Sequence, residues 1–134
     1  MKIYLAARFS KIKEMRVVKE LLEKHGLTVT SSWLEQDGGH DDLKDRNNDW
    51  AFSEYAQMDL DDIDQANIFM LFSEDPEFKN VRGGRHVETG YALASNKTMI
   101  VIGPRENIFH CLPSFEIYDT VEEFLAWALH DQRE

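Results

Sequence analysis

Three short runs of the sequence are apolar at nearly every position, and they limit the possible folds more than any other feature. They are KIYLAA at residues 2–7, ANIFMLF at 66–72 and KTMIVI at 97–102. A strand with one face in water alternates apolar and polar residues, whereas a uniformly apolar strand is buried on both faces. Strands of this kind occur in parallel sheets that carry helices on both sides. The runs therefore predict a parallel sheet inside an α/β domain.

The segments between these runs have the apolar spacing of helices. Helices are expected from the cap residue Ser10 to Gly26, over 51–65, over 83–94 and after Thr120. On the helix at 83–94, the expected core residues are Val87, Tyr91, Leu93 and Ala94. Two further strands are expected at 27–34 and 115–118, so that strands and helices alternate along the chain.

This alternation predicts a doubly wound, three-layer α/β fold of the Rossmann-like or flavodoxin-like kind, with a parallel sheet of about five strands. The 134 residues suffice for one domain, which we expect to span 1–134. An acidic polar tract at 35–48 interrupts the pattern. It is expected to be a loop, either a lid or a solvated insertion.

Charge and cysteine content narrow the classes of function. The formal net charge of −10 opposes binding to a nucleic-acid polymer but leaves room for a small anionic ligand held by local groups. No apolar run is long enough for a membrane span, and MKIYLAARFSKIKEMR lacks the apolar stretch of a secretory signal. The single cysteine, Cys111, fits a reducing compartment. We therefore expect a cytoplasmic protein with no membrane partner.

Ligands of a doubly wound sheet bind beyond the carboxyl ends of its strands. Four segments are expected to meet there, namely 4–10, the tract after Trp33, 73–88 and 103–109. Neither G-x-G-x-x-G nor G-x-x-x-x-G-K-[ST] occurs among them. The sequence His86-Val87-Glu88 matches the H-x-E half of zinc deaminases, but one cysteine cannot supply the C-x-x-C that also holds the metal. We expect no cofactor and no metal.

Glu88, within GGRHVETGYALA, is the first candidate for chemistry. It lies in the first turns of a predicted helix, where the partial positive charge of the helix end favours the ionised acid. A charged carboxylate at the strand ends suits a nucleophile. Gly83 and Gly84 would let an anionic ligand approach the backbone N–H groups, and Arg85 would add positive charge.

Asp59 is the second candidate, and Asp61, Asp62 and Asp64 lie close to it in the sequence. Most of the four are expected to face water, because they cannot all be buried and they lie at the negative end of a helix. One whose pKa is raised would serve as a proton donor. Spacing alone does not say which.

Together these segments resemble one enzyme family, the nucleoside 2-deoxyribosyltransferases and the related 2′-deoxynucleoside 5′-phosphate N-hydrolases. The resemblance covers nearly the whole chain: IYLA in the first strand, MDL before ANIFMLF, VETGYALA on a helix that follows a strand, and NIF late in the chain. VETGYALA is its most specific part.

The resemblance implies a role for each matching residue. Glu88 is similar to the family's nucleophile, Asp59 to its general acid and base, and Tyr4 to the tyrosine that orients the nucleophile. Asn107, with Phe109 two residues on, is similar to a residue that a neighbouring subunit contributes at the 5′ end of the sugar. The implied reaction is retaining cleavage of an N-glycosidic bond without a metal, in a homodimer or higher homo-oligomer with shared active sites. The implied substrate is a small nucleoside or nucleotide.

The first loop departs from the phosphate-hydrolase branch, because AARFSK lacks that branch's glycines and serines. Contacts to a 5′ anion would come from Arg8, Ser10, Gly84 or Arg85. Both arginines could instead neutralise nearby acids. A free nucleoside and a 5′-monophosphate both stay open as substrates.

Structural explanations stand beside these roles. Tyr4 could be a core residue with a tethered hydroxyl, Asn107 a helix cap, and Trp33 either a base-stacking residue or part of the core. Asp62 or Asp75 could take the place of Asp59. The whole chain could also be a nucleotide-binding or sensing module, in which the glutamate binds a ribose without attacking it.

Overall fold

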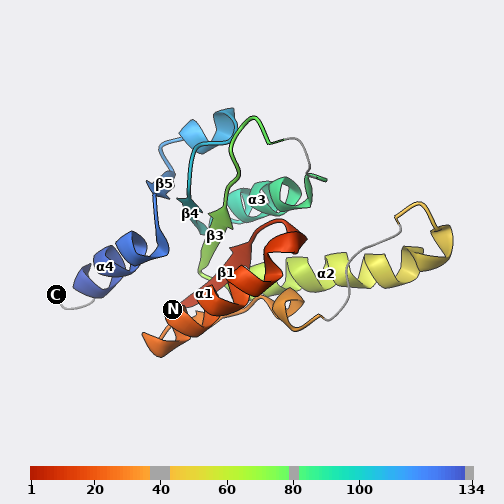
Figure 1. Ribbon diagram of the computed structural model, residues 1–134, viewed down its shortest axis with the longest axis horizontal. Coiled ribbons are helices and arrows are strands. Elements are labelled where there is room, and N and C mark those ends of the chain that lie inside the picture. The colour runs from red at the N-terminus through yellow and green to blue at the C-terminus, as the bar shows by residue number, and fades with distance from the viewer. Residues whose placement is uncertain (37–42, 79–81, 132–134) are drawn as a thin grey trace.

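The computed structural model describes residues 1–36, 43–78 and 82–131, and a five-stranded parallel sheet forms its centre (Figure 1). The strands, in the spatial order β2-β1-β3-β4-β5, are β1 (Lys2–Ala6), β2 (Thr28–Val29), β3 (Ile68–Phe72), β4 (Thr98–Ile102) and β5 (Phe115–Tyr118). Each neighbouring pair is parallel. This is the flavodoxin-like strand order, whose winding reverses between β1 and β3. The predicted fold class is confirmed.

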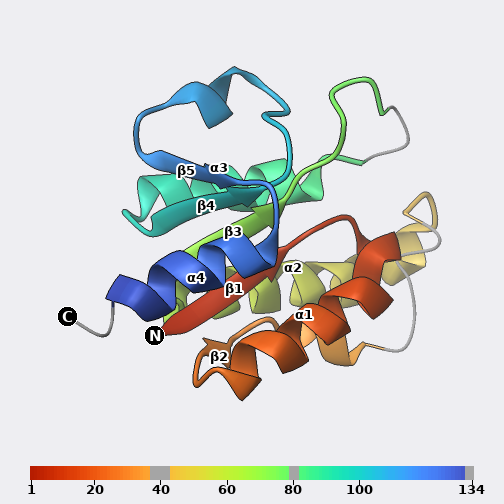
Figure 2. The same cartoon turned by 60° about the vertical axis from the view of Figure 1, so that its left-hand side comes forward.

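Helices cover both faces of the sheet and complete the three layers. Within the described ranges they are α1 (Ile12–Lys24), α2 (Asp49–Gln65), α3 (Gly84–Ala94) and α4 (Val121–Asp131). Helices α1 and α4 lie on one face, and α2 and α3 lie on the other (Figure 2). Short 3-10 turns occur at Phe9–Lys11 (η1), Ser32–Glu35 (η2), Arg46–Asn48 (η3) and Ile108–Cys111 (η4).

The core lies against the three central strands, as their uniformly apolar sequences require. All of β3 is buried, and β1 and β4 are buried from their second residues onward. Leu22 of α1, Ile63 of α2, Ala92 of α3 and Phe124 of α4 are fully buried against them. Among the described residues, no helix has the length and apolar character needed to cross a membrane.

The second strand is shorter than predicted, because side chains occupy the backbone groups that it would need. The sequence predicts a strand over 27–34, whereas β2 contains two residues. Beyond it, the Ser31 hydroxyl oxygen accepts a hydrogen bond from the Leu5 N–H (2.7 Å), and the Trp33 indole N–H donates one to the Leu5 carbonyl (2.8 Å). A longer β2 would use these same edge groups of β1. The chain therefore leaves the sheet and forms η2.

Two details predicted for the helices are wrong. Ser10 does not cap α1, since it lies in η1 and its hydroxyl oxygen accepts a hydrogen bond from Arg8 (2.9 Å). On α3, Val87 is 71% exposed and Ala94 is also exposed, because the helix turns a different stripe toward the sheet. The buried residues of α3 are Arg85, Thr89 and Ala92.

The predicted loop at 35–48 falls only partly within the described residues. Residues 37–42 lie outside them, and residues 46–48 form the 3-10 turn η3 directly before α2.

The connection from β4 to β5, residues 103–114, contains η4 and no α-helix. It begins at Gly103, whose φ of +117° favours glycine. A Cβ atom at this position would lie 2.6 Å from the Ser73 Oγ, whose hydroxyl donates a hydrogen bond to the Pro104 carbonyl (2.6 Å). The loops that follow β3 and β4 therefore meet at Gly103.

Replacing Gly103 with alanine should destabilise the fold more than the same change at Gly26. Both glycines have positive φ, and alanine costs about 1–2 kcal/mol in such a conformation. At Gly26 a Cβ atom would meet nothing within 4 Å, whereas at Gly103 it would displace the Ser73 hydroxyl. Loss of that hydrogen bond adds about 1 kcal/mol. Urea unfolding measures the difference, and equal losses in the two variants would show that Ser73 moves without cost.

Candidate active site

A cleft of about 750 Å³ opens at the carboxyl end of β1. Its walls are the loop after β1, one side of α2, and the chain at the start of α3. Of the residues predicted for the site, it brings together Tyr4, Arg8, Ser10, Asp59, Gly84, Arg85 and Glu88. Apolar and aromatic side chains, including Phe9, Trp33, Phe52, Tyr55 and Leu60, form the rest of its wall. Asn107 and Phe109 are not among the residues that line it.

Tyr4 and Glu88 meet inside this cleft. Tyr4 lies on β1 and is fully buried, with its ring stacked on that of Phe69 at 5.7 Å between centroids. Its hydroxyl donates a hydrogen bond to the Glu88 Oε2. Glu88 comes from the second turn of α3, so the bond joins the sheet to the helix. Both explanations offered for Tyr4 therefore describe it: it is a core residue, and its hydroxyl is tethered to the candidate nucleophile.

Glu88 is not the permanently charged acid that its place in the helix predicts. The pKa of Glu88 is raised to about 8, mainly by burial; the Tyr4 hydrogen bond opposes the rise, and the charges of Asp59 and Asp62 contribute to it. Loss of water around the carboxyl outweighs the partial positive charge of the helix end, because that charge is effective over little more than the first turn. With a pKa of about 8, Glu88 is mostly protonated at neutral pH.

Asp59 has the properties expected of a proton donor. Its Oδ1 is buried and has no hydrogen-bond partner among the described residues. Burial and, after it, the charge of Asp62 together raise the pKa of Asp59 to about 7. Two interacting carboxyl groups with such pKa values titrate as a pair, so between about pH 7 and about pH 8 they share roughly one proton.

The other aspartates proposed in place of Asp59 do not line the cleft. Asp61 accepts a hydrogen bond from Gln57 (2.9 Å), and Asp64 accepts one from Tyr91 (2.8 Å). Asp62 accepts hydrogen bonds from the N–H and the hydroxyl of Ser32, and Asp75 accepts a hydrogen bond from the Glu77 N–H. The geometry therefore favours Asp59 among these carboxyl groups.

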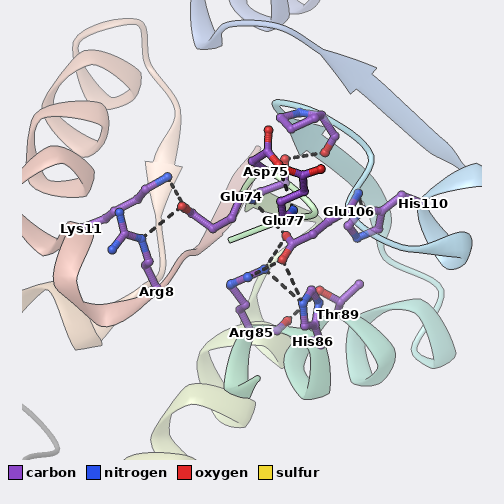
Figure 3. Close-up of polar contacts among 12 residues, drawn as sticks. Arg8, Lys11, Glu74, Asp75, Glu77, Arg85, His86, Thr89, Glu106 and His110 are labelled. Atoms are coloured by element: carbon purple, nitrogen blue, oxygen red, sulfur yellow. Dashed lines mark hydrogen bonds and ion pairs between the residues drawn. The ribbon is translucent and has the colours of Figure 1, made fainter. Parts of the chain in front are cut away.

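Arg8 and Arg85 both have acidic partners. The Arg8 Nε lies 3.3 Å from the Glu74 Oε1, and the Lys11 Nζ contacts the Glu74 Oε2 (Figure 3). Arg85 donates two hydrogen bonds to Glu106, at 2.6 and 2.5 Å. Of the two alternatives that the sequence leaves open, the structure shows neutralisation of nearby acids. Contact with a substrate anion stays a prediction for both arginines.

Glu106, in the loop after β4, is a residue near the cleft whose role no sequence pattern revealed. Its carboxylate accepts hydrogen bonds from Arg85 and from the Glu74 N–H (3.0 Å), and it lies 3.4 Å from the His86 Nε2. Its own N–H donates to the His110 Nδ1 (2.9 Å). Although burial opposes the effect, the Arg85 hydrogen bond holds the pKa of Glu106 below its ordinary value. Glu106 thus joins the loops after β3 and β4 to the start of α3 (Figure 3).

Asn107 and Phe109 lie on the surface of the β4–β5 connection. The Asn107 side chain accepts a hydrogen bond from the Phe109 N–H (2.9 Å) and so caps η4, which is one of the two roles expected for it. Phe109 is 59% exposed. Contact with a neighbouring subunit's substrate stays a prediction. Trp33 is nearly buried, and it also lines the cleft.

Within residues 1–36, 43–78 and 82–131, no three His, Cys, Asp or Glu side chains are grouped so that they could hold a metal ion.

Solved structures of two enzymes are similar to this chain over nearly its whole length. Clostridium botulinum CMP N-glycosidase is 22% identical, with a TM-score of 0.56, over 96% of this chain and 98% of that one. A 2-deoxyribosyltransferase from the psychrotolerant bacterium Bacillus psychrosaccharolyticus is 21% identical, with a TM-score of 0.66, over 92% of this chain and 90% of that one. No protein-family model matches the sequence, and no curated protein does. At these identities the likeness shows a shared fold, which is the fold that the resemblance of the sequence implies.

Replacing Glu88 with glutamine should stabilise the fold, and the gain should grow with pH. The pKa of Glu88 is about 8 in the folded chain, against an ordinary value of 4.5. Between these values folding takes up a proton, so the wild type loses stability as the pH rises, whereas glutamine has no proton to lose. The gain should be near zero at about pH 4.5 and, for a difference of about 3.5 pKa units, on the order of 5 kcal/mol at about pH 9.

Thermal unfolding across this pH range measures the effect. The matched control is Glu54→Gln, which changes an exposed glutamate of α2 and should leave stability unchanged. A gain for Glu88→Gln that is the same at every pH would contradict the raised pKa.

Proposed function

We propose that the protein cleaves the N-glycosidic bond of a 2′-deoxynucleoside or its 5′-monophosphate and transfers the deoxyribosyl group to another base or to water. The observation that carries this proposal is the hydrogen bond from Tyr4 to Glu88, in a cleft that also holds Asp59. The names of both structural neighbours describe enzymes that act at a bond between a sugar and a base.

In the first step, Glu88 attacks C1′ of the sugar. A bond forms between its Oε1 and C1′, the C1′–N bond breaks, and the electron pair passes to the base. Asp59 gives its proton to the departing base. The Tyr4 hydroxyl holds Oε2, which leaves Oε1 as the attacking oxygen.

In the second step, water or another base attacks C1′ and releases Glu88. Asp59, now a carboxylate, takes the proton of the attacking group. Two successive inversions at C1′ retain the configuration of the sugar. Attack by water gives hydrolysis, and attack by a base gives transfer.

The reactive protonation state has Glu88 ionised and Asp59 protonated. In the pH range where the two carboxyl groups share about one proton, the higher pKa of Glu88 favours the opposite arrangement, so the proton must move to Asp59 to give this state. The hydrogen bond from Tyr4 favours it, since it lowers the pKa of Glu88 relative to burial alone. The remaining negative charge suits a transition state in which positive charge develops on the sugar.

We further propose a homodimer or higher homo-oligomer, in which Asn107 and Phe109 reach the cleft of a neighbouring subunit. Two observations support this arrangement: both residues are exposed, and neither lines the cleft of its own chain.

Incubation with 2′-deoxynucleosides and their 5′-monophosphates, with and without a second base, should release free base. Glu88→Ala should lower the rate at least about 1000-fold, and Asp59→Asn about 100-fold or more. Glu54→Gln is the control and should match the wild type. Full activity in Glu88→Ala would refute the nucleophile. Saturable binding without release of base from any substrate would favour the binding or sensing module instead.

Mixing two inactive variants tests for shared sites. If Asn107 completes a neighbour's cleft, Glu88→Ala and Asn107→Ala subunits should together regain up to about a quarter of wild-type activity in a dimer, because some hybrid sites have both residues intact. Asn107→Ser is the control for capping, since serine also caps helices, and it should stay inactive if the amide contacts substrate. No recovery despite demonstrated subunit exchange would count against shared sites.

A further inference from the structure

Asp62 is a carboxylate held in place one helical turn beyond Asp59. Its Oδ2 accepts hydrogen bonds from the Ser32 N–H (2.8 Å) and from the Ser32 hydroxyl (2.5 Å). The backbone carbonyl of the same residue accepts a bond from the Thr30 hydroxyl (2.9 Å). The segment after β2 therefore fixes both the side chain and the backbone of Asp62.

Position on the helix separates Asp62 from the other aspartates of α2. Residues three apart lie on the same side of a helix, so the side chains of Asp62 and Asp59 are neighbours. Asp61 is exposed and bonded to Gln57, and it follows Asp59 by two positions, which turns it away. After burial, the charge of Asp62 is the other cause that raises the pKa of Asp59.

We infer that Asp62, fixed by Ser32, is a positioning residue that keeps on Asp59 the proton that the departing base receives. The inference rests on the proposed function of Asp59. The negative charge of Asp62 opposes a second negative charge one turn away, and its bonds to Ser32 keep that charge close to Asp59.

Other charged groups around Asp59 also influence its protonation. Tyr4 of β1 and Glu88 of α3 line the same cleft as Asp59, and the charge of Asp62 contributes to the raised pKa of each. Arginines also line the cleft, at Arg8, Arg82 and Arg85. Arg8 and Arg85 are engaged by Glu74 and Glu106. Removing the charge of Asp62 should therefore shift the titration of the whole pair of catalytic carboxyl groups toward lower pH.

The test is Asp62→Asn, which removes the charge and keeps an oxygen that can accept both hydrogen bonds from Ser32. The pH profile of single-turnover base release should move toward lower pH by about one pH unit, the scale of the interaction between two charges one turn apart. A shift of this size should lower the rate up to about tenfold on the alkaline side of the optimum and raise the rate on the acidic side.

Matched variants separate this role from a structural one. Asp61→Asn removes the same charge two residues from Asp59 and should leave the profile unchanged. Asp62→Glu keeps the charge and should restore most of the wild-type profile. A profile for Asp62→Asn that is lowered at every pH without moving would show a merely structural role and overturn the inference.

Titration of the Asp59 and Glu88 carboxyl carbons by NMR gives a readout that needs no turnover. Both midpoints should move to lower pH in Asp62→Asn, and unchanged midpoints would overturn the inference even in an active enzyme. If the midpoints shift but the wild-type protein releases no base, the proposed function is refuted. The effect of the Asp62 charge on the proton of Asp59 would still stand.

Discussion

Burial of the Glu88 carboxyl against the Tyr4 hydroxyl anchors the candidate site to the core. Tyr4 belongs to a strand packed on both sides, and its ring is stacked on the neighbouring strand, so its hydroxyl is held in one place. The packing that stabilises the sheet also removes water from the carboxyl and raises its pKa. Core stability and chemical reactivity at this edge therefore share one physical cause.

Arginine side chains at the carboxyl edge of the sheet form ion pairs that connect loops. Arg85 binds Glu106, and Arg8 binds Glu74, so segments after β1, β3 and β4 are joined around the cleft (Figure 3). Among the described residues, neither Glu88 nor Asp59 forms an ion pair of its own.

The sequence predicted the features that follow from local patterns. Uniformly apolar runs identified the central strands, and the segments after them identified the polar edge. The hydrogen bonds between the β1 backbone and the Ser31 and Trp33 side chains follow from no sequence pattern, so the predicted second strand is longer than β2. The partner of Arg85 lies 21 residues away and belongs to no recognisable motif. The pKa of Glu88 depends on how much water the folded chain removes, which helix position alone does not reveal.

The connection between β4 and β5, which has no α-helix, affects how this domain opens. Within η4 only His110 is buried, whereas the strands on either side are held by ladders of backbone hydrogen bonds. Segments with few buried contacts undergo local unfolding at a lower free energy than the domain as a whole. When this connection detaches, Glu106 leaves with it and Arg85 loses its partner. Local unfolding of this connection would thus remove an ion-pair partner from the helix that carries Glu88.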